Sequence, residues 1–194
     1  MTRPVAVAIT GGIGAGKSEA LAAFGRAGAA TVSSDEIVHE LLRRGDVREQ
    51  VARRLGDGVV GADGSLDRAA IAAVVFDDPD ALEWLEALLH PLVAAEYLSW
   101  RDELGRLEPP PQVCVTEVPL LYETGAEARF DRVVVITAPD EVRRARAGAP
   151  PDRRERRLLP DAEKAARADY SFVNTGTLAE LERFVRSVLD DVMG

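Results

Sequence analysis

The first part of the chain alternates between short apolar runs and a helical pattern. Residues 5–10 form a continuous apolar run, which is typical of a strand buried on both faces of a parallel sheet. Apolar positions in residues 17–26 recur at helical spacing, Gly28 supplies a stop signal, and residues 30–33 have the pattern of a second short strand. This part of the sequence therefore predicts one strand–helix–strand unit, with a glycine-rich loop after the first strand.

A mainly helical region follows the second strand. Ser34 or Asp35 is placed to cap the first of its helices. Residues 46–107 are then almost wholly helical in period, apart from the turn-rich segments 56–58 and 61–64. We expect this region to be a helical excursion from the sheet.

The remaining residues return to the pattern of a buried sheet. Residues 113–115 and 133–136 are apolar runs, and residues 170–173 are suited to a last strand. Residues 178–192 have the pattern of a closing amphipathic helix. Residues 143–157 are rich in arginine and are broken by one glycine and two prolines, so we interpret them as a mobile basic flap.

Composition narrows the kind of protein. The 194 residues, 46% hydrophobic and 29% charged, fit one globular α/β domain. The net charge of -9 argues against a nucleic-acid partner, because binding to a phosphate backbone needs clustered positive charge. Neither a signal-peptide pattern nor a long apolar run is present, so we expect no membrane partner and a cytoplasmic location.

Cys114 is the only cysteine, so an internal disulfide is excluded. We expect its side chain to be buried.

The glycine-rich loop carries the strongest chemical signal. Residues 11–18, Gly-Gly-Ile-Gly-Ala-Gly-Lys-Ser, satisfy the pattern G-x-x-x-x-G-K-[ST] between a predicted strand and a predicted helix. Glycines let consecutive backbone N–H groups wrap closely around a phosphate, and the helix N-terminus adds partial positive charge. In such a loop Lys17 reaches the β- and γ-phosphates and Ser18 binds Mg²⁺. The sequence therefore predicts a nucleotide-binding P-loop.

Other residues favour a kinase over the other P-loop classes. A guanine-reading N-K-x-D motif is excluded, because Asn174 is the only asparagine and no lysine follows it. A short chain with a basic flap suits a small kinase whose lid closes on ATP and excludes water. Asp35, just after the second strand, is placed to orient or deprotonate an acceptor hydroxyl. On position alone, it could equally be a helix cap.

The sequence resembles the dephospho-CoA kinase family over essentially its whole length. Three motifs carry the resemblance in the first half: T-G-G-I-G-A-G-K-S, S-S-D-E-I-V-H ending at His39, and an insert with D-G-S-L-D-R, V-F-D-D-P and L-E-A-L-L-H-P. Further matches are P-L-L-Y-E at residues 119–123, A-E-K at 162–164, A-D-Y at 168–170 and N-T-G at 174–176.

The resemblance implies a fold and a reaction. The fold is the three-layer P-loop NTPase fold, a parallel five-stranded sheet with flanking helices. The expected organisation is one domain, with a core of residues 1–45 and 109–194, a helical substrate-side insert of about 46–108 and a lid of about 144–160. The implied reaction is phosphorylation of the ribose 3'-hydroxyl of dephospho-CoA by ATP and Mg²⁺, with Asp35 as the base.

The resemblance also implies the site residues. Lys17 and Asp35 are the expected catalytic residues, Ser18 is the expected metal ligand, and Glu117 could hold Mg²⁺ through water. The expected nucleotide-binding residues are Gly12, Gly14, Ala15, Gly16, Lys17, Ser18, Glu19, Arg144, Arg146, Asn174 and Gly176, with Arg154 as a second lid arginine. The expected substrate-binding residues are Asp35, His39, His90, Pro119 and Leu120. His90, before a proline, could instead be an ordinary residue at a helix end.

Three departures from the family pattern keep alternatives open. Ser33 stands where the family usually has an aspartate, Glu19 stands where it usually has a threonine, and the lid is shorter than usual. Another small-molecule kinase, for a nucleoside monophosphate or shikimate, is one alternative. A catalytically silent nucleotide- or coenzyme-binding protein is the other. The sequence does not specify the oligomeric state.

Overall fold

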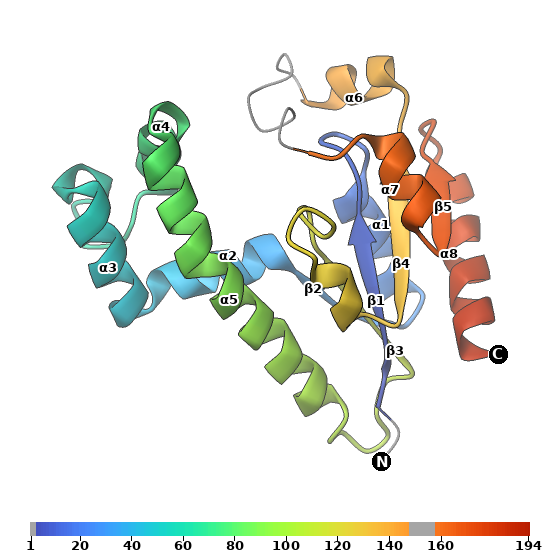
Figure 1. The fold of residues 1–194 in the computed structure, drawn as a ribbon. Coiled ribbons are helices and arrows are strands. Elements are labelled where there is room, and N and C mark those ends of the chain that lie inside the picture. The colour runs from blue at the N-terminus through green and yellow to red at the C-terminus, as the bar shows by residue number, and fades with distance from the viewer. Residues whose placement is uncertain (1–2, 148–157) are drawn as a thin grey trace. The chain divides into compact units, whose positions relative to one another are not determined.

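The structure, a computed structural model, describes residues 3–147 and 158–194 and contains a five-stranded sheet (Figure 1). The strands are β1 Val5–Thr10, β2 Ala30–Ser33, β3 Val113–Glu117, β4 Arg132–Thr137 and β5 Tyr170–Val173. Their order is β2-β3-β1-β4-β5, and every neighbouring pair is parallel. The predicted five-stranded parallel sheet is therefore confirmed.

The register brings the carboxyl ends of the central strands to one edge. Glu117, the last residue of β3, is opposite Ile9 of β1 on one side and Ser33 of β2 on the other. Thr10, the last residue of β1, is opposite Val135 of β4. In open parallel sheets, ligands bind outside this edge, beside the strand where the order of connection reverses. Here β1 has that place, and the glycine-rich loop directly follows it.

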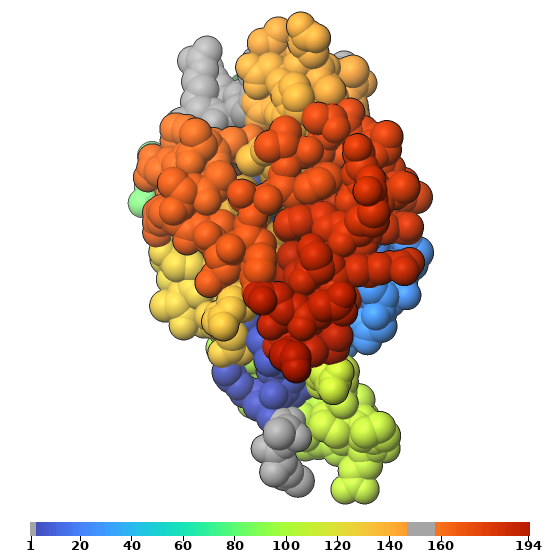
Figure 2. Space-filling model, turned by 90° about the vertical axis from the view of Figure 1, so that its right-hand side faces the viewer, coloured from blue at the N-terminus to red at the C-terminus, as the bar shows by residue number. Residues whose placement is uncertain are grey.

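Helices cover both faces of this sheet. On one face, α1 Lys17–Arg26 and α8 Leu178–Met193 pack on the strands in a core that includes Phe24, Ile136 and Leu181. On the other face, the segment after β3, which contains the short helix η2 Ala126–Arg129, packs with α7 Asp161–Arg167. The helix α6 Asp140–Ala147 follows β4. The segments from α6 to α8 are seen together in Figure 2. The result is three layers: helix, sheet and helix.

The chain divides into two compact units. Residues 1–34 and 100–194 form the unit with the sheet, and residues 35–99 form the second unit. The second unit is built from α2 Ser34–Arg43, α3 Gly45–Leu55, η1 Asp57–Val59, α4 Arg68–Asp77 and most of α5 Pro79–Leu104. The predicted helical character of residues 46–107 is thus confirmed. The second unit, residues 35–99, begins and ends earlier along the chain than the predicted insert of about 46–108. The bounds of that insert stay a prediction.

Two local predictions in this second part of the chain are wrong. Ser34 is already the first residue of α2, so neither Ser34 nor Asp35 is a cap before the helix, and Asp35 lies inside its first turn. His90 does not end a helix, because α5 continues through Pro91 to Leu104. A proline removes one backbone hydrogen bond, and a helix of 26 residues retains most of its others.

The flap interpretation is also wrong for the part that the structure describes. Residues 140–147 form α6, in which the side chain of Arg143 is 19% exposed and forms ion pairs with Asp140 and Asp161. An arginine-rich segment looked solvated in the sequence because the carboxylates that pair with it could not be located. Residues 148–157, which include Arg154 and most of the predicted lid, lie outside the described residues.

Candidate nucleotide and phosphate site

The glycine-rich loop joins β1 directly to α1 and has the backbone of a phosphate-binding loop. Gly14 and Gly16 have φ values of +73° and +97°, which side chains rarely allow. A Cβ at Gly11 would overlap with the carbonyl oxygen of Ile136, at the end of β4. Glycine is therefore required at these positions by backbone conformation and by close packing on the neighbouring strand.

Lys17, the predicted catalytic lysine, folds back over this loop. The ammonium group of Lys17 donates a hydrogen bond to the carbonyl oxygen of Gly12, with 3.0 Å between the two atoms. Ser18 follows in the first turn of α1 and is exposed, so its hydroxyl is open to a ligand. The N–H groups in the first turn of a helix carry partial positive charge, which makes this end of α1 suited to an anion.

Two predicted nucleotide-binding residues, Asn174 and Arg146, meet at the carbonyl oxygen of Ala15. The side-chain amide of Asn174, which is 5% exposed, donates to the carbonyl oxygen of Ala15 at 2.9 Å. Arg146 donates to the same oxygen at 3.4 Å and to the side-chain oxygen of Asn174, also at 3.4 Å. Gly176 is near this group, since a Cβ there would be 3.8 Å from the Arg146 guanidinium. Asn174 thus fastens the loop after β5 to the phosphate loop.

The segment after β3 lies beside the start of the loop. Val118 donates its backbone N–H to Ile9 at 2.9 Å, and the hydroxyl of Thr10 donates to the carbonyl oxygen of Pro119 at 3.2 Å. Pro119 and Leu120 are half-buried there. Glu117, which precedes them, is 5% exposed. The two predicted substrate residues of this unit are therefore held next to the end of β1.

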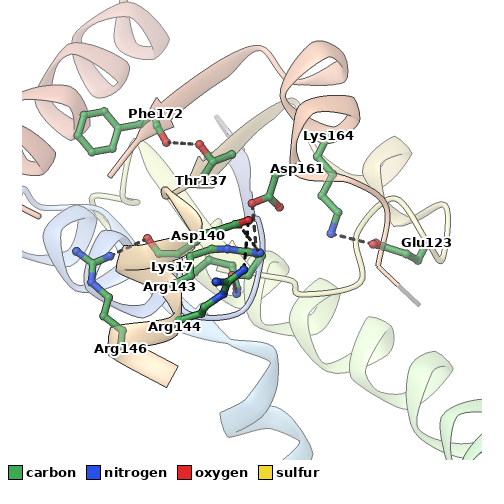
Figure 3. A network of polar contacts seen from close by, with 12 residues as sticks. Lys17, Glu123, Thr137, Asp140, Arg143, Arg144, Arg146, Asp161, Lys164 and Phe172 are labelled. Atoms are coloured by element: carbon green, nitrogen blue, oxygen red, sulfur yellow. Dashed lines mark hydrogen bonds and ion pairs between the residues drawn. The ribbon is translucent and has the colours of Figure 1, made fainter. Parts of the chain in front are cut away.

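A buried ion pair holds α7 against that same segment (Figure 3). The ammonium group of Lys164 is fully buried and lies 2.8 Å from a carboxylate oxygen of Glu123. The same oxygen accepts the backbone N–H of Leu159 at 2.9 Å. Near the other end of α7, Arg167 pairs with Glu127 at 2.6 Å and lies over the ring of Tyr122. Both matched family motifs, P-L-L-Y-E and A-E-K, therefore contribute to one internal contact.

Two predicted nucleotide-binding side chains, Glu19 and Arg144, form ion pairs at the exposed surface. The carboxylate of Glu19 lies 2.9 Å from the Arg26 guanidinium, at the exposed surface of α1, so a contact of Glu19 with nucleotide would have to use its backbone. The Arg144 side chain is 67% exposed and lies 3.9 Å from Asp140. Arg143, which the sequence did not single out, instead approaches the loop.

The other predicted site residues belong to the second unit. Asp35 and His39 lie on α2 and His90 lies on α5, and all three side chains are exposed. Asp35 follows Ser33, the last residue of β2, by two positions along the chain. Their roles stay predictions.

The oxygen-bearing side chains of Ser18 and Glu117 fit a magnesium ion that is shared with phosphates. Ser18 and Glu117 supply a hydroxyl and a carboxylate, the ligands that Mg²⁺ prefers. Among the described residues, no group of three or more His, Cys, Asp or Glu side chains could hold a metal by itself. Magnesium in kinases is held by one or two protein ligands together with the phosphates of the nucleotide, so this pattern suits such a site.

A parallel sheet with a P-loop after its central strand is the fold of the P-loop nucleotide-binding proteins. The family model described as dephospho-CoA kinase matches residues 5–180. The chain belongs to the dephospho-CoA kinase family. It is 42% identical over 184 residues to a dephospho-CoA kinase of Thiobacillus denitrificans, and the matched region covers 90% of this chain and 89% of the relative.

Solved structures agree with the fold. A crystal structure of a Thermus thermophilus protein matches with a TM-score of 0.80 and 36% identity, and it covers 100% of both chains. A shikimate kinase from Bacteroides thetaiotaomicron matches with a TM-score of 0.51 and 17% identity over 97% of this chain and 98% of the other, which shows the fold alone.

Two further observations concern the rest of the described structure. Within the described residues, no helix has the length and apolar character needed to cross a membrane. A small surface hollow is lined by Arg3, Pro4, Val5, Asp131, Arg132 and Val192. Because Val5 and Arg132 begin their strands, this hollow is at the amino edge of the sheet and takes no part in a site at the carboxyl edge.

Proposed function

We propose that the protein transfers the γ-phosphoryl group of ATP to the ribose 3'-hydroxyl of dephospho-CoA and so produces coenzyme A and ADP. The observation that carries the proposal is a correctly formed P-loop, at the carboxyl edge of the sheet, in a chain that matches the dephospho-CoA kinase family over residues 5–180. In the reaction, the acceptor oxygen bonds to the γ-phosphorus while the bond from that phosphorus to the β–γ bridging oxygen breaks.

The residues of the sheet unit bind and orient the nucleotide. The loop N–H groups and Lys17 hold the β- and γ-phosphates, and Lys17 exchanges its bond to the Gly12 carbonyl for bonds to phosphate oxygens. Ser18, with Glu117 through water, would hold Mg²⁺, which when bound neutralises charge on the phosphates. Asn174 and Arg146 keep the loop in position through Ala15.

The acceptor side is part of the same proposal. Asp35 takes the proton of the 3'-hydroxyl, supported by its place two residues after the carboxyl end of β2. We also propose His39, His90, Pro119 and Leu120 as residues that bind the coenzyme portion of the substrate. We include a cytoplasmic location, with neither a nucleic acid nor a membrane as partner.

The test is phosphoryl transfer by the purified protein. ATP and Mg²⁺ are supplied with dephospho-CoA, shikimate, AMP, CMP or no acceptor, and the product is identified by mass. Coenzyme A formed in the first reaction alone supports the proposal. Transfer to another acceptor would retain the kinase and reject the substrate, whereas ATP or dephospho-CoA binding without transfer would indicate a silent binding protein.

A further inference from the structure

An arginine of α6 lies against the phosphate loop. A Cβ added at Gly12 would overlap with the guanidinium of Arg143, and a Cβ at Gly14 would be 2.8 Å from the backbone carbonyl oxygen of Arg143. The helix α6 therefore packs on the loop backbone, and its Arg143 side chain reaches Gly12. The Arg144 side chain, next along the chain, is 67% exposed and lies 3.9 Å from the Asp140 carboxylate.

The side chain of Lys17 also contacts Gly12. The ammonium group of Lys17 is 3.0 Å from the Gly12 carbonyl oxygen, so two cations from different elements converge on one residue of the loop (Figure 3). Lys17 of a P-loop reaches the β- and γ-phosphates. A second cation at the same residue is therefore within reach of the terminal phosphates, whose charge is the largest in the nucleotide.

Two carboxylates hold the Arg143 guanidinium. One terminal nitrogen lies 3.2 Å from Asp140 on the same helix, and the other lies 3.6 Å from Asp161 at the start of α7. The Asp161 carboxylate is itself close to the loop, with its oxygens 2.9 and 3.0 Å from a Cβ at Gly12. Arg143 is 19% exposed and Asp161 is 25% exposed, so this pair is less screened by water than the surface pairs of the same helix.

We propose that Arg143 is a phosphate-contacting residue of the nucleotide site and that Asp161 is the positioning residue that holds its guanidinium at Gly12. This inference rests on the proposed function for the use of ATP, and it adds a residue that discriminates ATP from ADP. A planar guanidinium suits this task, because it can bind an oxygen of the γ-phosphate while it keeps its contact with Asp161. ADP lacks the γ-phosphate and loses that contact.

The experiment measures the dissociation constants of ADP and of an ATP analogue with a non-hydrolysable β–γ bridge, in the presence of Mg²⁺ and without acceptor. For Arg143→Ala, we expect the preference for the ATP analogue over ADP to fall about 10-fold or more, because a charge-assisted contact to the γ-phosphate is lost. Arg143→Lys should recover part of the preference. Arg186→Ala, an exposed arginine on α8, is the matched control and should leave it unchanged.

Asp161 is tested through Arg143. Asp161→Asn should reduce the preference for the ATP analogue over ADP by a smaller factor. The double variant should have the same preference as Arg143→Ala alone, because Asp161 acts through the guanidinium. Equal losses of ADP and ATP affinity in Arg143→Ala would mean that Arg143 only packs α6 on the loop, and would overturn the proposal. An added loss in the double variant, or tighter ATP binding in Asp161→Asn, would overturn the role of Asp161.

These measurements are separate from the identity of the acceptor. If the wild-type protein phosphorylates a different hydroxyl, the proposed function fails while the ATP preference and its dependence on Arg143 remain measurable. If coenzyme A is formed but Arg143→Ala keeps the full preference for ATP, the further inference alone fails.

Discussion

Removal of the Lys164 ammonium group should destabilise the sheet unit strongly. Lys164 is fully buried, and Glu123, 2.8 Å away, is 13% exposed. In Lys164→Met, the Glu123 carboxylate would stay in a site shielded from water, with the Leu159 N–H as a remaining donor. Loss of one partner of a buried ion pair costs about 3–5 kcal/mol. At about 2–4 °C per kcal/mol for a chain of this size, the melting temperature should fall by about 6–20 °C.

A double-mutant cycle separates the charge from the packing. The variant Lys164→Met with Glu123→Gln contains no unpaired buried charge, so it should be more stable than Lys164→Met alone. Arg167→Met is the matched control on the same helix. Its ion pair with Glu127 is partly exposed, so the expected loss is about 1 kcal/mol or less.

Urea unfolding followed by tryptophan fluorescence is the assay. Trp84 belongs to the helical unit and Trp100 to the sheet unit, so Trp84→Phe as a common background makes the signal report on the unit that contains the ion pair. A loss below about 1 kcal/mol in Lys164→Met, or strictly additive effects in the cycle, would refute the argument that a buried, unpaired Glu123 carboxylate is the cause.

Further outcomes are expected for two variants and for the Cys114 thiol. Asp35→Asn should lower kcat by about 100-fold or more with ATP binding nearly unchanged, as measured by steady-state kinetics and calorimetry, and wild-type turnover would reject Asp35 as the base. Lys17→Ala should reduce phosphoryl transfer severely, and a loss of less than about 10-fold would contradict its contact with the phosphates. Burial raises the pKa of the Cys114 thiol to about 11, so a thiol reagent at pH 8 should label the native protein far more slowly than the unfolded one. Because that pKa lies above the value of 9.0 for an unperturbed thiol, this group's contribution to stability should decline as pH rises from about 9 towards 11. Rapid labelling of the native protein would show that Cys114 is accessible.

Local patterns were sufficient for the sheet and the loop. Buried parallel strands are continuous apolar runs, so residues 5–10 and 133–136 were recognisable without any knowledge of their neighbours. The P-loop was recognisable because its backbone conformation requires glycine, and this requirement is local to the chain. Helical periodicity likewise predicted α8, although its end differs by one residue.

Contacts between distant charges could not be predicted in the same way. The flap interpretation of α6 failed because Arg143 is paired with Asp161, and nothing in the sequence pairs these two residues. The sequence contains Glu123 and Lys164 within matched motifs, yet only the fold shows that they are buried together. Pro91 predicted an end to the helix, but packing along α5 outweighs the single lost hydrogen bond.

The bond between Asn174 and Ala15 has a consequence for biosynthesis. The two residues are 159 positions apart, so the phosphate loop leaves the ribosome long before the residue that fastens it. At about 5–20 residues per second, the delay is about 8 to 30 seconds. During that time the nascent chain contains the complete P-loop sequence without the contact that holds the Ala15 carbonyl. The phosphate loop therefore gains this contact late in synthesis, only after β5 has emerged.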